Sequence, residues 1–461
     1  MKVCLNAFLV LCIVFHMTFL LPAEPYITVY GAVRGTAFYD TRDNWYGRRG
    51  YFSYLPAPEN FSTPYDIEGN PARQVDVAKK SSLGISFVES KLGVKIGGKD
   101  IGRFETAALI DGDFFGPSVA DGLADLVQGF RLRMAYCTLT DDCHKILFGQ
   151  NVHALFIPDC FPQVVCYDDG LPFECEAVCP QLRYSFVMPH WQFTCMMSSH
   201  REFEFWGPPG DDPRVIVDNF SWAPWFIRWS SMPALTMLTQ YKNGNFILGC
   251  GGEIKRVIPR IKTLFTLHDD QLGEHIYQVP TRAGVMGIVA EVYAAWNAEN
   301  GGVRAKLLYG QNCVEHGMLG GYAVTSRDAY NREEYTPLAT VSGWLDADVH
   351  FCKEYTLGIF FGALKHLRPR TRLYEDKDSD VNITVYELHR KVYDINGTIK
   401  EFFPCAAFRA SPRICWRRNQ LEVCGELEIN EATFGPYTSC GIDPQSTTAN
   451  VRASLYVAYY F

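Results

Sequence analysis

The chain has 461 residues, of which 14% are aromatic and 20% are charged, and its formal net charge at pH 7 is −8. This acidic balance argues against nonspecific binding to nucleic acid, whose phosphates attract basic proteins. After the first 23 residues no run of about 18 apolar residues occurs, so we expect no membrane-spanning helix in the rest of the chain.

An apolar segment opens the chain. Met1 and Lys2 precede an almost wholly apolar run from Val3 to Leu21, and Leu21-Pro22-Ala23 offers a small residue at a suitable cleavage point. The run is also long enough for a membrane anchor, which is the alternative, but no cluster of charges follows it. We therefore predict a secretory signal peptide over residues 1–23 and a mature chain over residues 24–461.

Short segments with alternating apolar and polar side chains follow in chain order, and amphipathic helices are scarce. Alternation with a period of two is typical of β-strands with two different faces. We predict sixteen strands, an even number, as single-chain bacterial barrels have. They are 26–38, 82–97, 102–114, 127–138, 144–151, 181–187, 191–198, 234–242, 246–257, 284–296, 303–311, 338–350, 354–364, 403–417, 420–431 and 447–461.

The connections between these strands alternate strictly between short and long. Asn243-Gly244 and Gly301-Gly302 lie in short connections, where such pairs supply the positive φ of tight hairpins. In a membrane barrel this pattern predicts turns on the periplasmic side and long loops outside. We expect 152–180, with its phenylalanines and Asp168-Asp169-Gly170, to fold inward and narrow the lumen. The long connections are 39–81, 115–126, 152–180, 199–233, 258–283, 312–337, 365–402 and 432–446.

Two segments allow more than one interpretation. In 82–97 the apolar parity shifts near Glu89, which indicates either a bulge or a hairpin. The aromatic segment 222–231 either lengthens the eighth strand or anchors a loop.

The last strand is the most informative segment. From Thr447 to Phe461 one face is apolar and aromatic, and the other carries hydroxyls, an amide and an arginine. A sandwich strand would explain the alternation, but a barrel's closing strand also explains why the chain stops on an aromatic residue. We expect it to pair with the first strand, and we predict that Tyr459 and Phe461 are needed for assembly.

Charged residues recur on the face opposite the apolar one. Arg or Lys turned toward lipid costs about 2–4 kcal/mol near the bilayer midplane, so we assign this face to a lumen. The alternative is the solvated face of a soluble sheet. The predicted pore-lining residues are Arg131, Arg133, Arg409, Arg413, Arg417, Arg452, Glu422, Glu426, Glu428, Asp111 and Asp113.

Cysteine is abundant, with sixteen in the chain and fourteen after the predicted signal peptide. Because the mature chain would pass through an oxidising compartment, we predict disulfides, with their connectivity left open. A zinc site in the 160–179 cluster is the alternative, but it lacks a C-x2-C pair and a histidine, so no metal site is predicted. The candidate disulfide cysteines are Cys137, Cys143, Cys160, Cys166, Cys175 and Cys179.

An enzyme would need reactive side chains that converge. A hydrolase of the serine type requires a nucleophile, a histidine and a carboxylate or amide together. No G-x-S-x-G motif occurs, and the histidines lie mostly in loops or turns. We therefore predict no catalytic residue and no cofactor, with an outer-membrane hydrolase as the enzyme alternative.

Several stretches resemble Gram-negative outer-membrane porins, in particular the DcaP-like branch and related uncharacterised barrels. The resemblance spans most of the mature chain in order. It departs from that branch by lacking a coiled-coil extension before Tyr26 and by its high cysteine content. The stretches are KLGVKIGGKDIGRFETAALIDGDFFG (Lys91–Gly116), FRLRMAY (Phe130–Tyr136), LFGQNVHALFIPDCFP (Leu147–Pro162), PQLRYSF (Pro180–Phe186) and FRASPRICW (Phe408–Trp416).

Together these observations predict an all-β protein, a single transmembrane antiparallel barrel of about 16 strands in the outer membrane of a Gram-negative-type bacterium. The resemblance implies passive diffusion of small hydrophilic solutes, anionic or neutral, and a barrel that often forms homotrimers. The expected partners are outer-membrane lipid, these solutes and the barrel-assembly machinery. The alternative is a structural or adhesive surface barrel whose lumen is plugged.

Overall fold

The computed structural model describes residues 25–47, 52–66, 68–118, 128–166, 170–199, 206–207, 216–217, 220–222, 225–269, 273–376, 383–394 and 396–461. The predicted signal peptide, 1–23, lies outside the described residues. Among the described residues no helix has the length and apolar character needed to cross a membrane.

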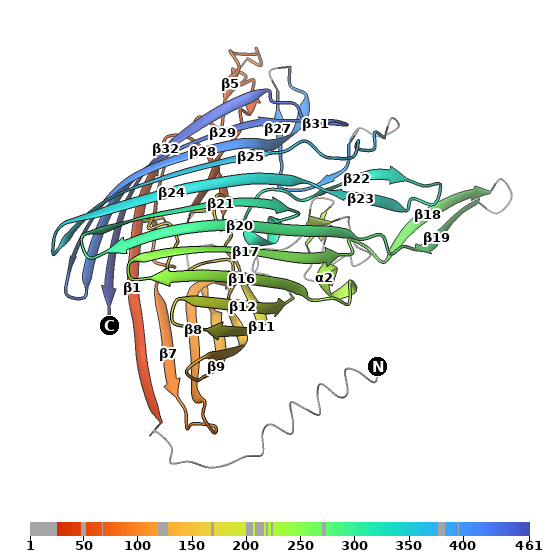
Figure 1. Cartoon of the computed structure of the whole chain (residues 1–461). Helices are drawn as coiled ribbons and strands as arrows, with labels where there is room; N and C mark the ends of the chain where they lie inside the picture. The colour runs from red at the N-terminus through yellow and green to blue at the C-terminus, as the bar shows by residue number, and fades with distance from the viewer. Residues whose placement is uncertain are drawn as a thin grey trace, which may run out of the picture.

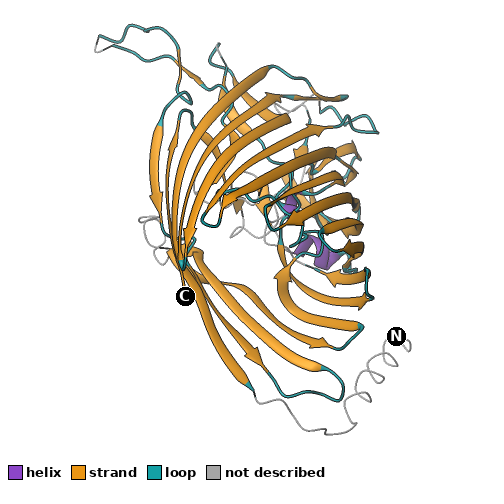
Figure 2. Cartoon of the chain, turned by 60° about the vertical axis from the view of Figure 1, so that its left-hand side comes forward, coloured by secondary structure: helices purple, strands orange, loops and turns teal. Residues whose placement is uncertain are grey.

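Sixteen antiparallel strands form a closed barrel (Figures 1 and 2), and every one of them overlaps a predicted strand. β6 and β7 count as one strand, because both pair with β1. The barrel strands are β1 (Tyr26–Asp40), β6 (Ser82–Ser86) with β7 (Lys91–Gly97), β8 (Glu105–Ser118), β9 (Gln128–Thr140), β10 (His144–Val152), β11 (Val178–Val187), β12 (Trp191–Ser198), β16 (Ala234–Asn243), β17 (Phe246–Val257), β20 (Val285–Ala298), β21 (Gly301–Gln311), β24 (Ala339–Cys352), β25 (Tyr355–His366), β28 (Ile399–Arg418), β29 (Leu421–Gly435) and β32 (Ser446–Tyr460).

The first and last strands close the barrel, as predicted. β1 pairs with β32 in a register that runs from Ala32 opposite Tyr460 to Asp40 opposite Arg452. The backbones of Gly31 and Phe461 exchange two hydrogen bonds, with N···O distances of 3.0 and 3.1 Å. Closure pairs both sheet edges, which would otherwise leave unsatisfied backbone groups in lipid.

The parity shift in 82–97 has a structural cause. β6 and β7 are separated by residues 87–90, and Glu89 turns into the barrel, where its carboxylate lies 2.5 Å from the guanidinium of Arg34. The interruption resembles a bulge rather than a hairpin, since both halves pair with β1 on the same side.

The short turns lie at one end of the barrel and the long connections at the other, as the alternation predicted. Several long connections carry their own elements, including the hairpin of β18 (Lys262–Asp269) and β19 (Gly273–Pro280), which projects from the wall in Figure 1. Segment 222–231 does not lengthen a strand, because it contains the helix α2 (Trp225–Trp229) and β16 starts only at Ala234.

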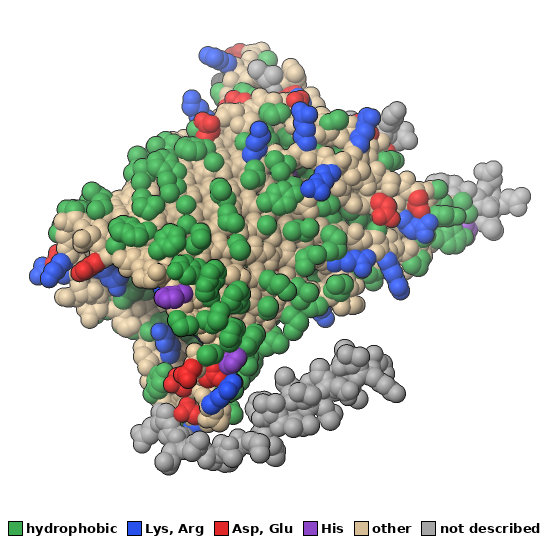
Figure 3. Space-filling model, viewed as in Figure 1, with side chains coloured by type: hydrophobic (Ala, Val, Ile, Leu, Met, Phe, Trp, Pro, Cys, Tyr) green, Lys and Arg blue, Asp and Glu red, His purple; other side chains and the backbone are tan. Residues whose placement is uncertain are grey.

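The outer wall is apolar and the inner wall is polar. Phe130, Leu132, Ile414 and Leu455 are between 47% and 54% exposed, while Arg413, on the other parity, is 6% exposed. On the face shown in Figure 3, hydrophobic side chains spread over the wall and charged ones gather toward its ends. A lipid-facing band around a polar interior explains this distribution.

The interior is not an empty tube. A cluster of buried apolar side chains lies inside the wall, and it joins loop residues such as Leu155, Phe173 and Leu319 to wall residues such as Trp344 and Phe360. Sixteen strands leave room for an aqueous channel, so in this barrel part of that room is filled by loops.

Candidate functional site: the lumen and its inward loop

The described residues of the connection between β10 and β11, 153–166 and 170–177, fold into the barrel and are here called the inward loop. Its backbone or side chains contact inward groups of β1, β17, β21, β24 and β29. The prediction that this connection folds inward is thus confirmed. What holds the loop there is a set of buried polar and apolar contacts.

A buried charge cluster provides the first anchor. Lys306 of β21 donates to Glu174 of the inward loop with an N···O distance of 2.6 Å, and its ammonium lies 3.3 Å from Glu291 of β20. Trp344 also donates to Glu174, at 2.6 Å. Because all three charged side chains have no solvent exposure, their mutual attraction is little screened by water.

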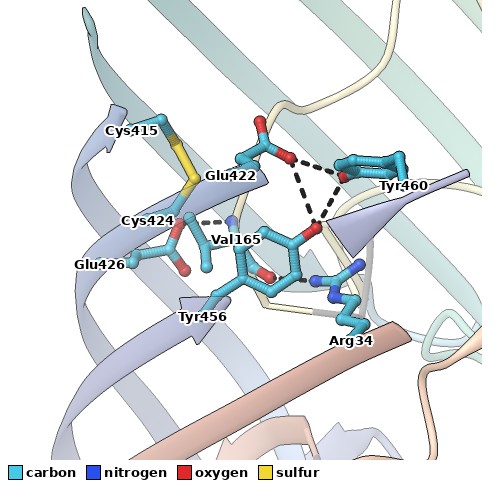
Figure 4. The surroundings of a disulfide bond; sticks show 8 residues. All are labelled: Arg34, Val165, Cys415, Glu422, Cys424, Glu426, Tyr456 and Tyr460. Carbon is cyan, nitrogen blue, oxygen red and sulfur yellow. Dashed lines mark hydrogen bonds between the residues drawn. A yellow bond between two sulfur atoms is a disulfide. The ribbon is translucent and has the colours of Figure 1, made fainter. Parts of the chain in front are cut away.

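A second anchor holds the far end of the loop across the lumen (Figure 4). The backbone N–H of Val165 donates to Glu426 at 2.8 Å, and Arg34 donates to the carbonyl of Val165 at 2.7 Å. The loop is therefore tied to β29 and β1 as well as to β21.

Four of the six cysteines predicted to form disulfides do not form one in the structure. The structure joins Cys415 of β28 to Cys424 of β29, and it leaves Cys137, Cys143, Cys160 and Cys175 as thiols. The prediction of disulfides was correct in kind and wrong for these four residues. Cys166 is buried in the inward loop, and Cys179 is buried at the start of β11.

The buried thiols of the inward loop are in an environment that makes them unreactive. Desolvation raises the pKa of Cys160 to about 12, and it raises the pKa of Cys175 well above its usual range. Since the thiolate is the reactive form, these residues pack as small apolar side chains.

Sequence reasoning overlooked the disulfide that the structure contains, although a signal was present. The tight turn at Asn419 pairs Arg418 with Leu421, and counting back along this register brings Cys415 opposite Cys424. Both residues have the inward parity, so the disulfide lies on the lumen side of the wall (Figure 4).

Most of the predicted pore-lining arginines lie on the inner wall in ion pairs. Arg131 contacts Asp113 at 2.6 and 2.8 Å, Arg452 contacts Asp40 at 2.9 Å, and Arg409 contacts Glu428 at 2.9 Å and Glu426 at 3.4 Å. The row of arginines on β28 thus lies against the row of glutamates on β29.

These pairs are largely removed from water. Arg409 and Arg452 are each 1% exposed, and Asp113 is fully buried. Arg133 is half-buried on the inner face, and Asp111 accepts a hydrogen bond of 2.9 Å from Tyr30. Whether a permeating solute reaches these groups stays a prediction.

A cavity of about 1150 Å³ lies in the lumen, between the inward loop and the short turns at the end of the barrel. It brings together Arg413, Arg417 and Glu422 from the predicted set, with the inward loop's Val165 on one wall. Tyr456 and Tyr460 of β32 also line it, and Tyr460 donates to Glu422 at 2.6 Å (Figure 4). We call this space the lumen cavity.

The charges around the lumen cavity nearly balance. Arg413 is bound by Asp346 through two hydrogen bonds of 2.7 and 3.0 Å, and Arg304 contacts Asp346 and Asp348. Arg417 is exposed, and its guanidinium lies 5.1 Å from the ring centre of Tyr460. The lining basic residues are Arg34, Arg304, Lys353, Arg413 and Arg417, and the acidic ones are Glu299, Asp348, Glu354 and Glu422.

One group among the described residues could ligate a metal ion. His153 at the start of the inward loop, Glu253 of β17 and His316 of the short helix η3 (Val314–His316) are buried, and their ligand atoms lie within 4.8 Å of one another. Sequence reasoning missed this group because its members are 100 and 63 residues apart and only the loops bring them together.

No protein-family model and no curated protein match the chain. Among solved structures it is similar to the outer membrane channel DcaP of Acinetobacter baumannii, with 14% sequence identity, a TM-score of 0.61, and coverage of 97% of this chain and 100% of that one. It is also similar to outer-membrane OmpT of Vibrio cholerae, with 9% identity, a TM-score of 0.50, and coverage of 96% and 100%. At these identities the likeness concerns the fold: the chain has the sixteen-stranded barrel of outer-membrane porins.

Proposed function

We propose that the protein is a porin-like channel through which small hydrophilic solutes diffuse passively across an outer membrane. The observation that carries this proposal is a closed sixteen-stranded barrel that is apolar outside and charged inside, with a lumen cavity of about 1150 Å³. A closed barrel satisfies its backbone hydrogen bonds in lipid, and a charged interior keeps water inside it.

The location and assembly belong to the same proposal. The apolar outer wall and the porin fold support a place in the outer membrane of a Gram-negative-type bacterium, with lipid as the surrounding partner. We further propose that residues 1–23 are a signal peptide, that the barrel-assembly machinery inserts the chain, and that the barrel forms homotrimers. We propose no catalytic role.

Anion preference is the finer part of the proposal. Arg417 supports it, because this guanidinium is exposed at the lumen cavity while Arg413 is held by Asp346. Glu299, Glu354 and Glu422 on the same wall oppose it. We therefore propose a weak preference, of the size that one or two unpaired charges produce.

Conductance across a planar lipid bilayer tests the channel function. Folded protein, identified by its heat-modifiable migration, should produce stepwise single-channel currents in salt, whereas boiled protein should produce none. Absence of steps from protein that is folded and inserted would contradict the proposal.

The second candidate is a surface barrel with a plugged lumen, and one observation favours it. The inward loop and the apolar cluster around Phe173 fill part of the interior. This candidate predicts inserted protein that does not conduct until the inward loop is shortened, so the same bilayer measurement separates the two functions.

A further inference from the structure

Two loops and one strand meet at a buried cluster inside the barrel. His153 belongs to the inward loop, Glu253 to β17, and Glu315 and His316 to η3 in the connection after β21. All four side chains have no solvent exposure. Nothing in the proposed diffusion of solutes requires two histidines and two carboxylates at this place.

The donor atoms of the cluster converge. His153 Nε2 lies 2.8 Å from one carboxylate oxygen of Glu253, and His316 Nε2 lies 2.9 Å from the other. A carboxylate oxygen of Glu315 lies 3.6 Å from the same His316 Nε2. The two imidazole rings meet edge to face, with centroids 4.7 Å apart. The ligand atoms of His153, Glu253 and His316 therefore face a common point, and Glu315 lies beside them.

The charged side chains of the cluster allow two protonation states. Glu253 and Glu315 are both carboxylates, and Lys255, whose Nζ lies 3.6 Å from Glu253 and pairs with Glu315, supplies one positive charge. Nδ1 of His316 lacks a hydrogen bond among the described residues. Because buried charges must be compensated, two carboxylates beside one ammonium require either a protonated histidine or a bound cation.

We propose that His153, Glu253 and His316 bind one divalent transition-metal ion of the zinc type. Imidazole nitrogen and carboxylate oxygen are the ligands that zinc takes in four-coordinate sites, at distances of about 2.0–2.2 Å. Two histidines and one glutamate supply three of the four ligands, and a water molecule would take the fourth position. The ion would cross-link the inward loop to the connection after β21 and to the wall.

The competing explanation is that Glu253 only accepts hydrogen bonds from the two histidines. In that arrangement the N–H of Leu155 donates to Nδ1 of His153 at 3.2 Å, which keeps the proton of His153 on Nε2. Metal binding at Nε2 would move this proton to Nδ1 and give up the Leu155 hydrogen bond. The two arrangements therefore differ in whether Nε2 carries a proton or a metal ion.

Metal content of the folded full chain tests the proposal. Protein purified without a histidine tag is stripped with a chelator, incubated with Zn²⁺, desalted and analysed by mass spectrometry for metal. We expect one zinc per chain, and Co²⁺ in its place should give the visible absorption of a four-coordinate nitrogen and oxygen site. Less than about a tenth of an ion per folded chain would overturn the proposal.

Matched variants assign the ion to these residues. The double variant His153→Gln, His316→Gln should lose the zinc, whereas His190→Gln, His350→Gln should keep it, because His190 and His350 are exposed at the short turns. Thr236→Val removes a hydroxyl 3.2 Å from Glu253 and should weaken zinc binding by about 10-fold or more, the size of an outer-shell effect. Equal zinc content in both double variants would also overturn the proposal.

A second measurement covers the case in which a ligand variant folds poorly. Hydrogen exchange of the unmodified chain should slow on addition of Zn²⁺ in the segments around 153–157 and 313–319, and the hairpin of β18 and β19 should be unaffected. Unchanged exchange in both segments would contradict the cross-link. The metal-site proposal does not depend on channel activity. Absence of conductance would contradict the proposed channel function without contradicting the metal site.

Discussion

At the scale of single residues, the described inner wall pairs most of its inward arginines with a carboxylate. Arg409, Arg413 and Arg452 are buried and bound by acidic neighbours on adjacent strands. Removing one partner of such a pair costs about 3–5 kcal/mol, because the other charge is left buried and uncompensated. These arginines therefore contribute more to the stability of the barrel wall than to the electric field in the lumen.

Arg417 differs from these arginines, and it is the residue to change for selectivity. Arg417→Glu should lower the preference for anions over cations. In water two unit charges about 8 Å apart interact by roughly 0.5 kcal/mol, so reversing one charge shifts the energies of an anion and of a cation by about 1 kcal/mol each in opposite directions. The anion-to-cation permeability ratio should therefore change by about 30-fold at low salt, and less at high salt. The reversal potential in a salt gradient measures this ratio.

Arg103→Glu is the matched control, because Arg103 is also an exposed arginine at a short turn and is not among the residues that line the lumen cavity. It should leave the reversal potential unchanged. Equal reversal potentials for wild type and Arg417→Glu would show that solutes do not pass this side chain.

At the scale of elements, the inward loop is held by contacts spread along its whole length. Val165, Phe173 and Glu174 bind three different parts of the wall. No disulfide among the described residues contributes to this, so the loop's position depends on buried charge and apolar packing. The loop should stay in place under reducing conditions.

Deleting residues 163–177 should raise single-channel conductance, because it removes the part of the inward loop that crosses the lumen. Lys306 and Glu291 would then be hydrated by lumen water instead of being left dry. Deleting 264–278 removes the same number of residues from the projecting hairpin of β18 and β19 and should not change conductance. Identical conductance in both deletions would mean that the inward loop does not limit the current.

The closing strand gives a second element-scale prediction. Phe461 is 56% exposed on the outer wall, exchanges two backbone hydrogen bonds with Gly31, and places its ring over that glycine. Removing Phe461 alone should lower the amount of heat-modifiable barrel in the outer membrane, since the pairing of β32 with β1 becomes incomplete.

Tyr460 must be kept in that truncation, because its hydroxyl binds Glu422 at the lumen cavity and its loss could change conductance by itself. Tyr460→Phe serves as the control and should assemble at wild-type levels. If the chain lacking Phe461 were inserted as well as the wild type, the role of this residue in assembly would be wrong.

At the scale of the whole molecule, the strict alternation of turns and long connections assigns each end of the barrel to one side of the membrane. Cys143 is exposed at the turn between β9 and β10, and Cys440 is exposed in the connection between β29 and β32. They lie at opposite ends, so their labelling reports on orientation.

A maleimide too large to pass the barrel should label Cys440 in intact cells and Cys143 only after the outer membrane is permeabilised. The variants Cys440→Ser and Cys143→Ser identify which residue carries each label. The buried Cys160 and Cys175 should stay unlabelled in the folded protein, because burial keeps their thiols protonated and out of reach. The opposite pattern of labelling would invert the orientation.

The strand positions, the closing pair and the inward direction of the charged faces could all be predicted from the sequence. Each of these follows from a period of two and from turn length, which are local properties that neighbouring residues carry themselves. Even the Cys415–Cys424 pair follows from the register of its tight turn. Segment 222–231 was harder, because its aromatic residues suit a strand and a helix equally.

What fills the lumen was decided only by the tertiary structure. Lys306 meets Glu174 across 132 residues, Arg452 meets Asp40 across 412, and His153 meets Glu253 across 100. Such partners depend on how the barrel staggers its strands and on how the loops pack inside it, and neither leaves a periodic trace in the sequence. Alternation tells which side chains turn inward, and only the closed barrel determines which of them meet.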